Sequence, residues 1–260
     1  MDTKMPVIFV GHGSPMNAIE ENIYTQNWTK IGKSIIKPRV ILIFSAHWIT
    51  EYETRISTAE HPQMIYDMGG FPPELYQTRY TAPGSESIAR EISDLLSETG
   101  FNITGDSHRG FDHGIWSVLI HMFPDANIPV ISLSLDYFVG TKSLFELGQK
   151  LASLREKGII IIGSGNIVHN LRTLDFSNNK IYPWAIEFDK KITENLIQKN
   201  YKEILDFQSW GDISKYAHPT YDHILPLFPI LGTLGDNEKV EFFNEGIDLG
   251  SISMRSMIWR

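Results

Sequence analysis

Residues 159–165 read Ile-Ile-Ile-Ile-Gly-Ser-Gly, and this stretch decides the fold. Four consecutive β-branched residues form a continuous apolar run rather than an alternating one. Such a run predicts a strand that is buried on both faces, as in a largely parallel sheet covered by helices. Three further runs have the same character, at residues 7–10, 40–44 and 130–133.

Helical patterns lie between and after these runs. Residues 85–98 and 143–155 place leucines and isoleucines at helical spacing, and Gly158 ends the second segment. Residues 184–195 and 197–207 predict a later helical pair, and residues 250–259 a last strand. Residues 175–180 and 235–239 are expected to be surface loops. The sequence therefore predicts the α/β class, as a single catalytic domain over residues 1–260 with a central, mostly parallel mixed sheet flanked by helices.

Composition limits the chemistry. The chain has 260 residues, no cysteine and nine histidines, so a metal site would use imidazole and carboxylate rather than thiolate. Its net charge of −8, without a basic block, argues against nucleic acid or an anionic membrane surface as a partner. The apolar runs are too short for a membrane span or a signal-peptide core, so a cytoplasmic protein is expected.

Three histidines come soon after predicted buried strands: His12 in VGHGSP, His47 in FSAHW and His169 in GSGNIVHN. Ligand sites in open α/β sheets form where loops leave the carboxyl ends of strands. Each histidine alone could instead be a core or loop residue. A fourth candidate lies in AHPTYDHILPL, where His223 opens an apolar segment and His218 is the alternative.

His113 lies between glycines in GFDHGIWS. It either lines a pocket or belongs to an ordinary helix start capped by Asp112. The remaining histidines lack such a context: His108 is expected in a polar loop and His121 on a helix face, while His61 is undecided.

Imidazoles dispersed over the chain favour a catalytic site with an open coordination position that holds Zn²⁺ or Fe²⁺. Such an ion could generate hydroxide for hydrolysis, or hold a substrate together with O₂. Nearby aromatic residues would suit a flat aromatic substrate, although any one of them could simply fill the core. They are Trp48, Tyr66, Phe71, Phe111 and Trp116.

Eight segments together resemble the bacterial 4,5-DOPA extradiol dioxygenases, within the class III, LigB-like ring-cleavage superfamily. They run in one order over nearly the whole chain. These segments are GHGSPMNA (11–18), SAHW (45–48), GGFPPELY (69–76), GFDHG (110–114), GSGNIVHNLR (163–172), YPWA (182–185), DHILPL (222–227) and the terminal SISMRS.

The resemblance implies an oxidoreductase that inserts O₂ into a catechol such as L-DOPA, next to the diol. It implies a single Zn²⁺ or Fe²⁺ ion held by His12, His47 and His223. His169 would be a fourth ligand or the catalytic acid and base, and His113 a catalytic residue that hydrogen-bonds oxygen or substrate. Better known ring-cleaving relatives use two histidines and a glutamate, so an all-imidazole site here would be one charge more positive.

Further expectations stay open from the sequence. Arg172 could hold a substrate carboxylate or form a surface salt bridge. The rivals to a dioxygenase are a zinc-dependent hydrolase, a tetrapyrrole chelatase-like enzyme, which would not need His47, His169 and His223 as well as His12, and a non-enzymatic metal-binding scaffold. The chain is expected to be a monomer or small homo-oligomer that takes a small catechol and O₂.

Overall fold

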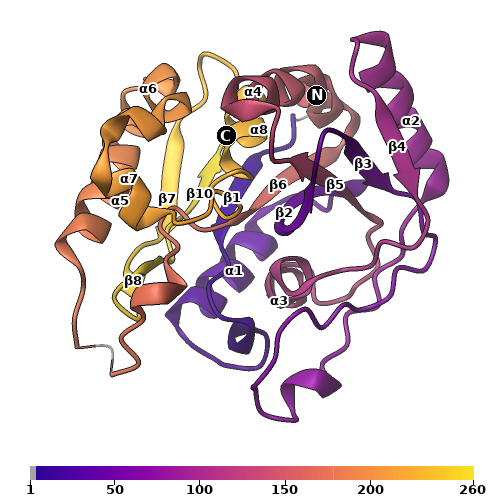
Figure 1. Ribbon diagram of the computed structural model, residues 1–260. Helices are drawn as coiled ribbons and strands as arrows, with labels where there is room; N and C mark the ends of the chain where they lie inside the picture. Colours follow the sequence, from indigo (N-terminus) through magenta and orange to yellow (C-terminus); the bar gives the residue numbers. More distant parts are fainter. Residues whose placement is uncertain (1–3, 178) are drawn as a thin grey trace.

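A computed structural model describes residues 4–177 and 179–260. Its centre is an eight-stranded sheet in the order β4-β3-β5-β2-β6-β1-β10-β7, and a separate pair joins β8 to β9 (Figure 1). The strands are β1 (Val7–Gly11), β2 (Val40–Thr50), β3 (Thr54–Ser57), β4 (Ile103–Asp106), β5 (Val130–Asp136), β6 (Ile159–Gly165), β7 (Val240–Asn244), β8 (Ile247–Asp248), β9 (Ile252–Ser253) and β10 (Ser256–Trp259).

The middle of the sheet is parallel and its flanks are mixed. Strands β5, β2, β6 and β1 pair in parallel, as do β3 and β4. Strand β10 pairs antiparallel with both β1 and β7, and β3 pairs antiparallel with β5. The predicted α/β fold with a mostly parallel mixed sheet is confirmed.

Successive residues of the inner strands enter two different cores. Val7 and Phe9 of β1 pack into one core, whereas Ile8 and Val10 pack into the other. Strand β6 alternates in the same way along its four isoleucines. Each fully buried side chain of this size contributes about 1.5–3 kcal/mol by leaving water. The continuous apolar runs therefore do mark strands buried on both faces.

Helices cover both faces of the sheet (Figure 1). Residues of α2, α4, α5 and α8 belong to the first core, and residues of α1 and α3 to the second. The helices are α1 (Ile23–Ser34), α2 (Glu86–Glu98), α3 (His113–Met122), α4 (Gly140–Leu151), α5 (Pro183–Ile197), α6 (Tyr201–Leu205), α7 (Asp212–Ala217) and α8 (Leu227–Gly232).

Some predicted boundaries were wrong. The segment 143–155 starts earlier, at Gly140, and its end is a 3₁₀ turn, Ala152–Lys157, which Gly158 terminates with φ +77°. The predicted helix 197–207 is only α6, because α5 runs on to Ile197 and Lys199 then turns the chain with φ +55°. The predicted last strand is two strands in different sheets, β9 and β10.

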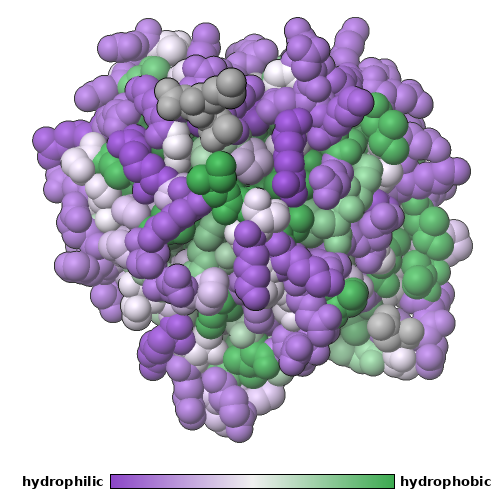
Figure 2. All heavy atoms as spheres, turned by 180° about the vertical axis from the view of Figure 1, so that it is seen from behind, coloured by the Kyte–Doolittle hydropathy of each residue, from purple (hydrophilic) through white to green (hydrophobic). Residues whose placement is uncertain are grey.

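Hydrophilic residues dominate the surface seen from behind, with hydrophobic residues in small scattered groups (Figure 2). Among the residues described, no helix has both the length and the apolar character needed to cross a membrane.

A buried ion pair joins the sheet to its surroundings at the end opposite the carboxyl edge of the parallel strands. Arg155 is 1% exposed and lies just before β6. Its guanidinium donates to the carbonyls of Met5 (2.8 Å) and Thr233 (2.9 Å) and to both carboxylate oxygens of Glu238. Glu238 therefore belongs to a fixed structure, although the sequence suggested a simple surface loop there.

Replacing Glu238 with Gln should lower the free energy of unfolding by about 3 kcal/mol at pH 7, because a buried guanidinium loses its partner. Burial raises the pKa of Glu238, but the hydrogen bonds from Arg155 lower it by more, so the net shift of this pKa is downward. The stabilisation is thus complete above the unfolded-state pKa of about 4.3 and is lost as pH falls through the lower folded pKa. Chemical denaturation from pH 7 to pH 3 should show the difference between wild type and Glu238→Gln shrinking below about pH 4.

Asp212→Asn is the control, because Asp212 pairs with Lys215 on the surface with 76% of its side chain exposed. That change should cost under about 1 kcal/mol. Equal costs for the two variants would contradict the structural role of the buried pair.

Candidate metal centre

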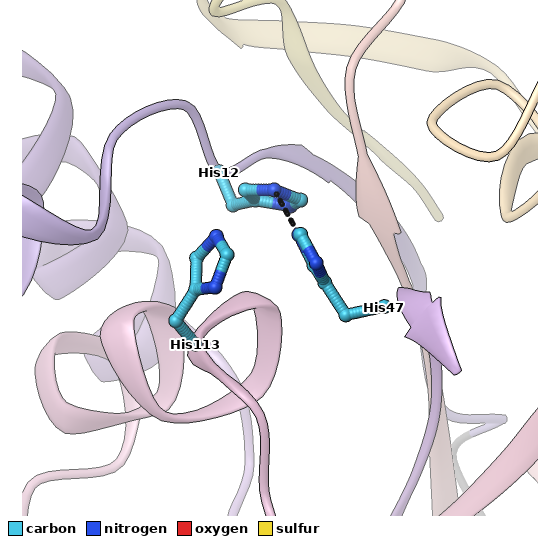
Figure 3. Close-up of side chains that lie close together, drawn as sticks. All are labelled: His12, His47 and His113. Carbon is cyan, nitrogen blue, oxygen red and sulfur yellow. Dashed lines mark hydrogen bonds between the residues drawn. The ribbon is translucent and has the colours of Figure 1, made fainter. Parts of the chain in front are cut away.

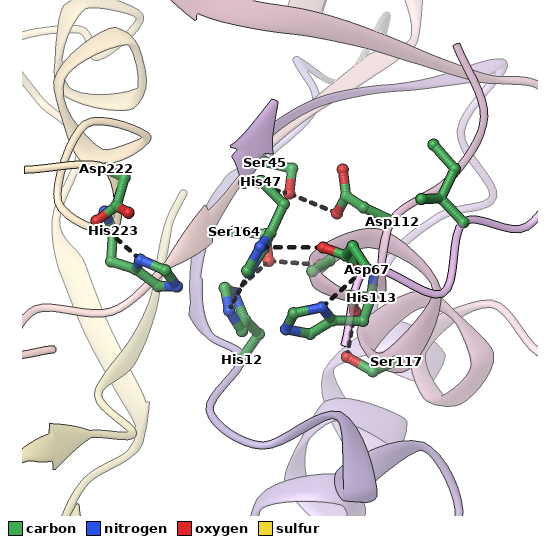
Figure 4. Close-up of polar contacts among 12 residues, drawn as sticks. His12, Ser45, His47, Asp67, Asp112, His113, Ser117, Ser164, Asp222 and His223 are labelled. Carbon is green, nitrogen blue, oxygen red and sulfur yellow. Dashed lines mark hydrogen bonds and ion pairs between the residues drawn. The ribbon is translucent and has the colours of Figure 1, made fainter. Parts of the chain in front are cut away.

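Five histidines from distant parts of the chain meet at the carboxyl edge of the parallel strands. His12 directly follows β1, and His169 follows β6. His113 is the first residue of α3, and His223 precedes α8. The ring centroids of His12, His47 and His223 lie 5.0–5.3 Å from one another (Figure 4).

His47 lies within β2, not after it as the sequence suggested. Strand β2 continues to Thr50, and its register with β5 shifts between Phe44 and Ile49. Such irregularities re-aim side chains next to functional sites. The interrupted ladder explains how a residue inside a strand reaches the loops that carry the other histidines.

Two imidazole nitrogens face each other at the centre of this cluster. His12 Nε2 and His47 Nε2 are 3.2 Å apart (Figure 3). Nitrogen ligand atoms of His12, His47 and His113 all lie within 4.8 Å of one another. Two nitrogens that bind one Zn²⁺ ion tetrahedrally at 2.0–2.1 Å would lie about 3.3 Å apart. The observed separation therefore suits two ligands of one ion.

Hydrogen bonds behind the rings fix which nitrogen is free. The Ser164 hydroxyl donates to the carbonyl of Gly114 (2.5 Å), so toward His12 Nδ1, at 3.1 Å, its oxygen accepts. On the other ring, His47 Nδ1 lies 3.1 Å from a carboxylate oxygen of Asp67. Both Nδ1 atoms thus carry hydrogen, and both Nε2 atoms are left to face each other.

Two bare nitrogen lone pairs repel each other, so a positive particle must lie between them. Burial, followed by the neighbouring histidines, holds the pKa of His12 well below its usual value, and this ring is neutral. Burial also lowers the pKa of His47, but Asp67 and other carboxylates outweigh it and the net shift is upward. Either a proton on His47 or a metal ion bound by both rings satisfies the contact, and the ion would displace the proton.

His113 and His223, like His47, each have a carboxylate oxygen close to Nδ1. His113 Nδ1 forms a hydrogen bond of 2.9 Å with Asp67 Oδ1. His223 Nδ1 lies 3.0 Å from Asp222 Oδ1 as an ion-pair contact, without the geometry of a hydrogen bond. Carboxylates in this position orient metal-binding histidines and fix their tautomer. Burial lowers the pKa of His223 to about 4 even though Asp222 opposes the shift, so its imidazole is neutral and able to bind a metal.

His169 lies flat against His223. The two ring centroids are 3.4 Å apart and the planes differ by 6°. Burial, with His223 next, holds the pKa of His169 well below its usual value. Imidazole binds a metal in the plane of its ring, so an ion in the plane of His223 lies outside the plane of His169. The stacking therefore disfavours both rings as ligands of one ion.

Close backbone approaches hold these histidines in place. A Cβ at Gly165 would lie 2.2 Å from the carbonyl oxygen of His223, and that carbonyl accepts from Asn166 N at 2.8 Å. A Cβ at Gly114 would lie 2.7 Å from Ser45 Oγ and 3.1 Å from the ring of His47. Glycine at both positions allows the segments that carry His223, His47 and His113 to pack together.

A buried network supports the backbone around His47. Ser45 donates to Asp112 Oδ1 (2.6 Å) and accepts from the amide of His47 (3.2 Å). Arg109 donates to the other oxygen of Asp112 and to the carbonyl of His47 (3.3 Å). Asp112 stands at the N-cap of α3 but makes no side-chain capping bond, so the alternative in which its side chain caps the helix is wrong. It serves the Ser45–Arg109 network instead.

The other candidates lie outside the cluster. His218, the alternative to His223, points its Nε2 at the carbonyl of Ile167 (2.8 Å). It belongs to none of the sets of three ligand residues whose ligand atoms lie within 4.8 Å of one another in the described part of the chain. His121 lies on α3, as predicted, with Nε2 2.7 Å from the Asn17 carbonyl. His61, His108 and Arg172 are exposed.

The predicted aromatic wall is mostly core. Phe111 and Trp116 are fully buried, and Trp48 lies under the guanidinium of Arg109. Trp116 does border the site, with its ring 6.4 Å from that of His113, and Tyr66 packs on Trp116.

Sequence reasoning missed the acceptors behind the histidines. Asp67 and Ser164 were not singled out, and Asp222 was quoted only as part of a motif. Ser164 sits in the decisive IIIIGSG stretch and Asp222 adjoins His223, so both could have been found. Asp67 follows no predicted strand, and only the fold brings it to the histidines.

Imidazoles gathered at the carboxyl edge of a mixed α/β sheet are typical of a metalloenzyme that holds a single metal ion. Residues 6–254 match the LigB family, described as the catalytic LigB subunit of aromatic ring-opening dioxygenase. The chain belongs to this family, and the predicted family relationship is confirmed.

Similar proteins agree with that assignment. The 4,5-DOPA dioxygenase extradiol of Escherichia coli K12 is 42% identical over 98% of this chain and 94% of its own length. The protein of the same name from Beta vulgaris is 36% identical over 98% of this chain and 96% of its own. A crystal structure of an uncharacterized Escherichia coli K12 protein has a TM-score of 0.85 and 38% identity, covering 98% of this chain and 99% of that one.

Replacing Ser164 with Ala should weaken metal binding about 10–100-fold, because His12 loses the acceptor that fixes its tautomer. Competition with a chromophoric chelator would measure the affinity. Ser132→Ala is a matched control, since Ser132 is also buried in the sheet but its hydroxyl has no hydrogen-bond partner. An unchanged affinity in Ser164→Ala would show that this hydroxyl does not orient His12.

Proposed function

We propose that this protein is a metal-dependent extradiol dioxygenase that opens the ring of a catechol such as L-DOPA by inserting O₂ next to the diol. Membership of the LigB family and the names of the similar proteins support this activity. The observation that carries it is the pair of Nε2 atoms, 3.2 Å apart, each left free by a hydrogen bond on its Nδ1.

His12, His47 and His223 would hold one Fe²⁺ or Zn²⁺ ion. Their imidazoles are the donor type that both ions accept. When bound, the ion supplies a Lewis acid for the two diol oxygens and, as Fe²⁺, redox chemistry toward O₂. His113 also lies close enough to compete as the third ligand, since one of its ring nitrogens lies within 4.8 Å of those of His12 and His47.

His169 would serve as the acid and base rather than as a fourth ligand. Its ring stacks on that of His223, which would place it beside the metal site without making it a ligand. Its lowered pKa keeps the ring neutral, so one nitrogen can take a proton from a catechol hydroxyl. The imidazolium so formed would be able to return that proton to the ring-opened product, so the overall reaction needs no net proton.

His113 would orient the substrate. Its Nδ1 lies 2.9 Å from Asp67 Oδ1, so a hydrogen on Nδ1 would leave a lone pair at Nε2. That lone pair can accept a hydrogen bond from a diol hydroxyl. Trp116 borders this ring and excludes water from that side of the site.

The activity is tested by loading the protein anaerobically with Fe²⁺, adding L-DOPA and then air. A yellow ring-opened product that contains both atoms of O₂, with matching oxygen consumption, is expected. The zinc form, loaded in parallel, should bind catechol with little turnover. No turnover of any of several catechols by protein with confirmed iron content would overturn the proposal.

Single alanine variants should separate the roles of the histidines. His12→Ala, His47→Ala and His223→Ala should each empty the site, whereas His169→Ala should retain metal and lose most turnover, by about 10²–10⁴-fold. His113→Ala should retain metal and lower turnover. Metal content by elemental analysis and turnover are measured separately, and His121→Ala, outside the cluster, is the control. Metal loss in His113→Ala together with metal retention in His223→Ala would show that His113, not His223, is the third ligand.

Several finer expectations stay predictions. These are the cytoplasmic location, the monomer or small homo-oligomer, the single catalytic domain over residues 1–260 and the choice between iron and zinc. A substrate-carboxylate role for Arg172 is also untested.

A further inference from the structure

Among the residues that the structure describes, Asp67 is the one carboxylate that contacts two histidines of the cluster. Its Oδ2 is 3.1 Å from His47 Nδ1, and its Oδ1 is 2.9 Å from His113 Nδ1. Oδ1 also accepts from the backbone amide of His113 at 3.1 Å. Both carboxylate oxygens are therefore committed to different rings (Figure 4).

The segment that carries Asp67 has no regular secondary structure but is firmly anchored. Met64 forms a bridge with Phe111, and the amide of Ile65 donates to the carbonyl of Phe111 at 2.7 Å. Trp116 Nε1 donates to the carbonyl of Ile65 at 3.1 Å, and the Tyr66 hydroxyl to that of Thr78 at 2.7 Å. Three successive residues before Asp67 are thus tied to the body of the protein, so its carboxylate has a defined position.

We propose that Asp67 is a positioning residue that locks His47 and His113 together in the Nδ1–H tautomer, so that both present Nε2 to the metal centre. The inference rests on the proposed metal site, in which His47 is a ligand and His113 is not. The two ring centroids are only 3.9 Å apart, and this separation matches one carboxylate spanning both Nδ1 atoms.

An asparagine at position 67 cannot do this. Its amide has one acceptor oxygen and one donor nitrogen, so it can accept from only one of the two Nδ1–H groups. The other ring would face an N–H donor, and must either turn or move its hydrogen to Nε2. A hydrogen on Nε2 of His47 would block metal binding there, and one on Nε2 of His113 would turn an acceptor into a donor.

Asp222 provides a matched comparison within the same site. Its polar contacts use Oδ1, which is 3.0 Å from His223 Nδ1 and accepts from the His223 amide (2.9 Å) and the Thr220 hydroxyl (3.1 Å). An asparagine at position 222 keeps that acceptor. Asp67→Asn and Asp222→Asn therefore make the same chemical change beside a metal-site histidine, but only the first removes a needed acceptor.

The test measures metal affinity, histidine tautomers and kinetics in both variants. Asp67→Asn should bind Zn²⁺ about 10–100-fold more weakly in a chelator competition, whereas Asp222→Asn, which loses the same negative charge but keeps its acceptor oxygen, should lose clearly less affinity. Long-range ¹H–¹⁵N spectra, assigned with single His→Gln variants, should show one of His47 and His113 leaving the Nδ1–H tautomer in Asp67→Asn alone. In the iron form, kcat should fall more than KM rises.

Equal losses in the two variants, or unchanged tautomers in Asp67→Asn, would overturn the proposal. The wild-type protein gives a test that needs no folded variant, because an Nε2–H tautomer of neutral His47 or neutral His113 would also overturn it. Affinity and tautomers are measured on zinc-loaded or metal-free protein, so failure of catechol cleavage would refute the proposed function without touching this one.

Discussion

The contact between His12 Nε2 and His47 Nε2 is the constraint on which the rest of the site depends. Two neutral imidazoles do not approach nitrogen to nitrogen at 3.2 Å unless something positive lies between them. The protein enforces this approach from behind, with a hydroxyl oxygen on one ring and a carboxylate on the other. The sheet makes it possible, because β1 and β2 lie on either side of β6, and Ser164 of β6 is the residue that accepts from His12.

The charge of the centre is distributed in two layers. The inner layer consists of imidazoles, of which burial keeps His12 and His223 neutral. The outer layer holds Asp67 and Asp222, whose pKa values burial would raise but whose hydrogen bonds to histidine keep far below the usual range. Two negative charges thus surround the proposed metal site. The proposed ligands include no carboxylate, but two carboxylates lie one hydrogen bond further out and supply the negative charge.

The sequence predicted the central strands and their two-sided burial, since an unbroken β-branched run has few other stable placements. It also predicted His12, His169 and His223 as residues of a site at the carboxyl edge of the parallel strands. It misplaced His47, because the register shift within β2 depends on pairing with β5, which apolar patterning does not encode. It missed Asp67 for a stronger reason. No strand or helix leads directly into that residue, and its position depends on contacts with Thr78 and, far along the chain, with Phe111 and Trp116.

These misses share a physical cause. Ligands are visible in a sequence because their residue types are rare and their chemistry is specific, whereas the groups that orient them are ordinary serines and aspartates. The orienting groups nevertheless decide which nitrogen of each ring is free, and with it whether the ring binds a metal at all. Gly165 and Gly114 belong to the same layer, since a single methyl group at either would collide with a segment that carries a histidine. The chemistry of this site is therefore specified as much by the second layer of contacts as by the histidines themselves.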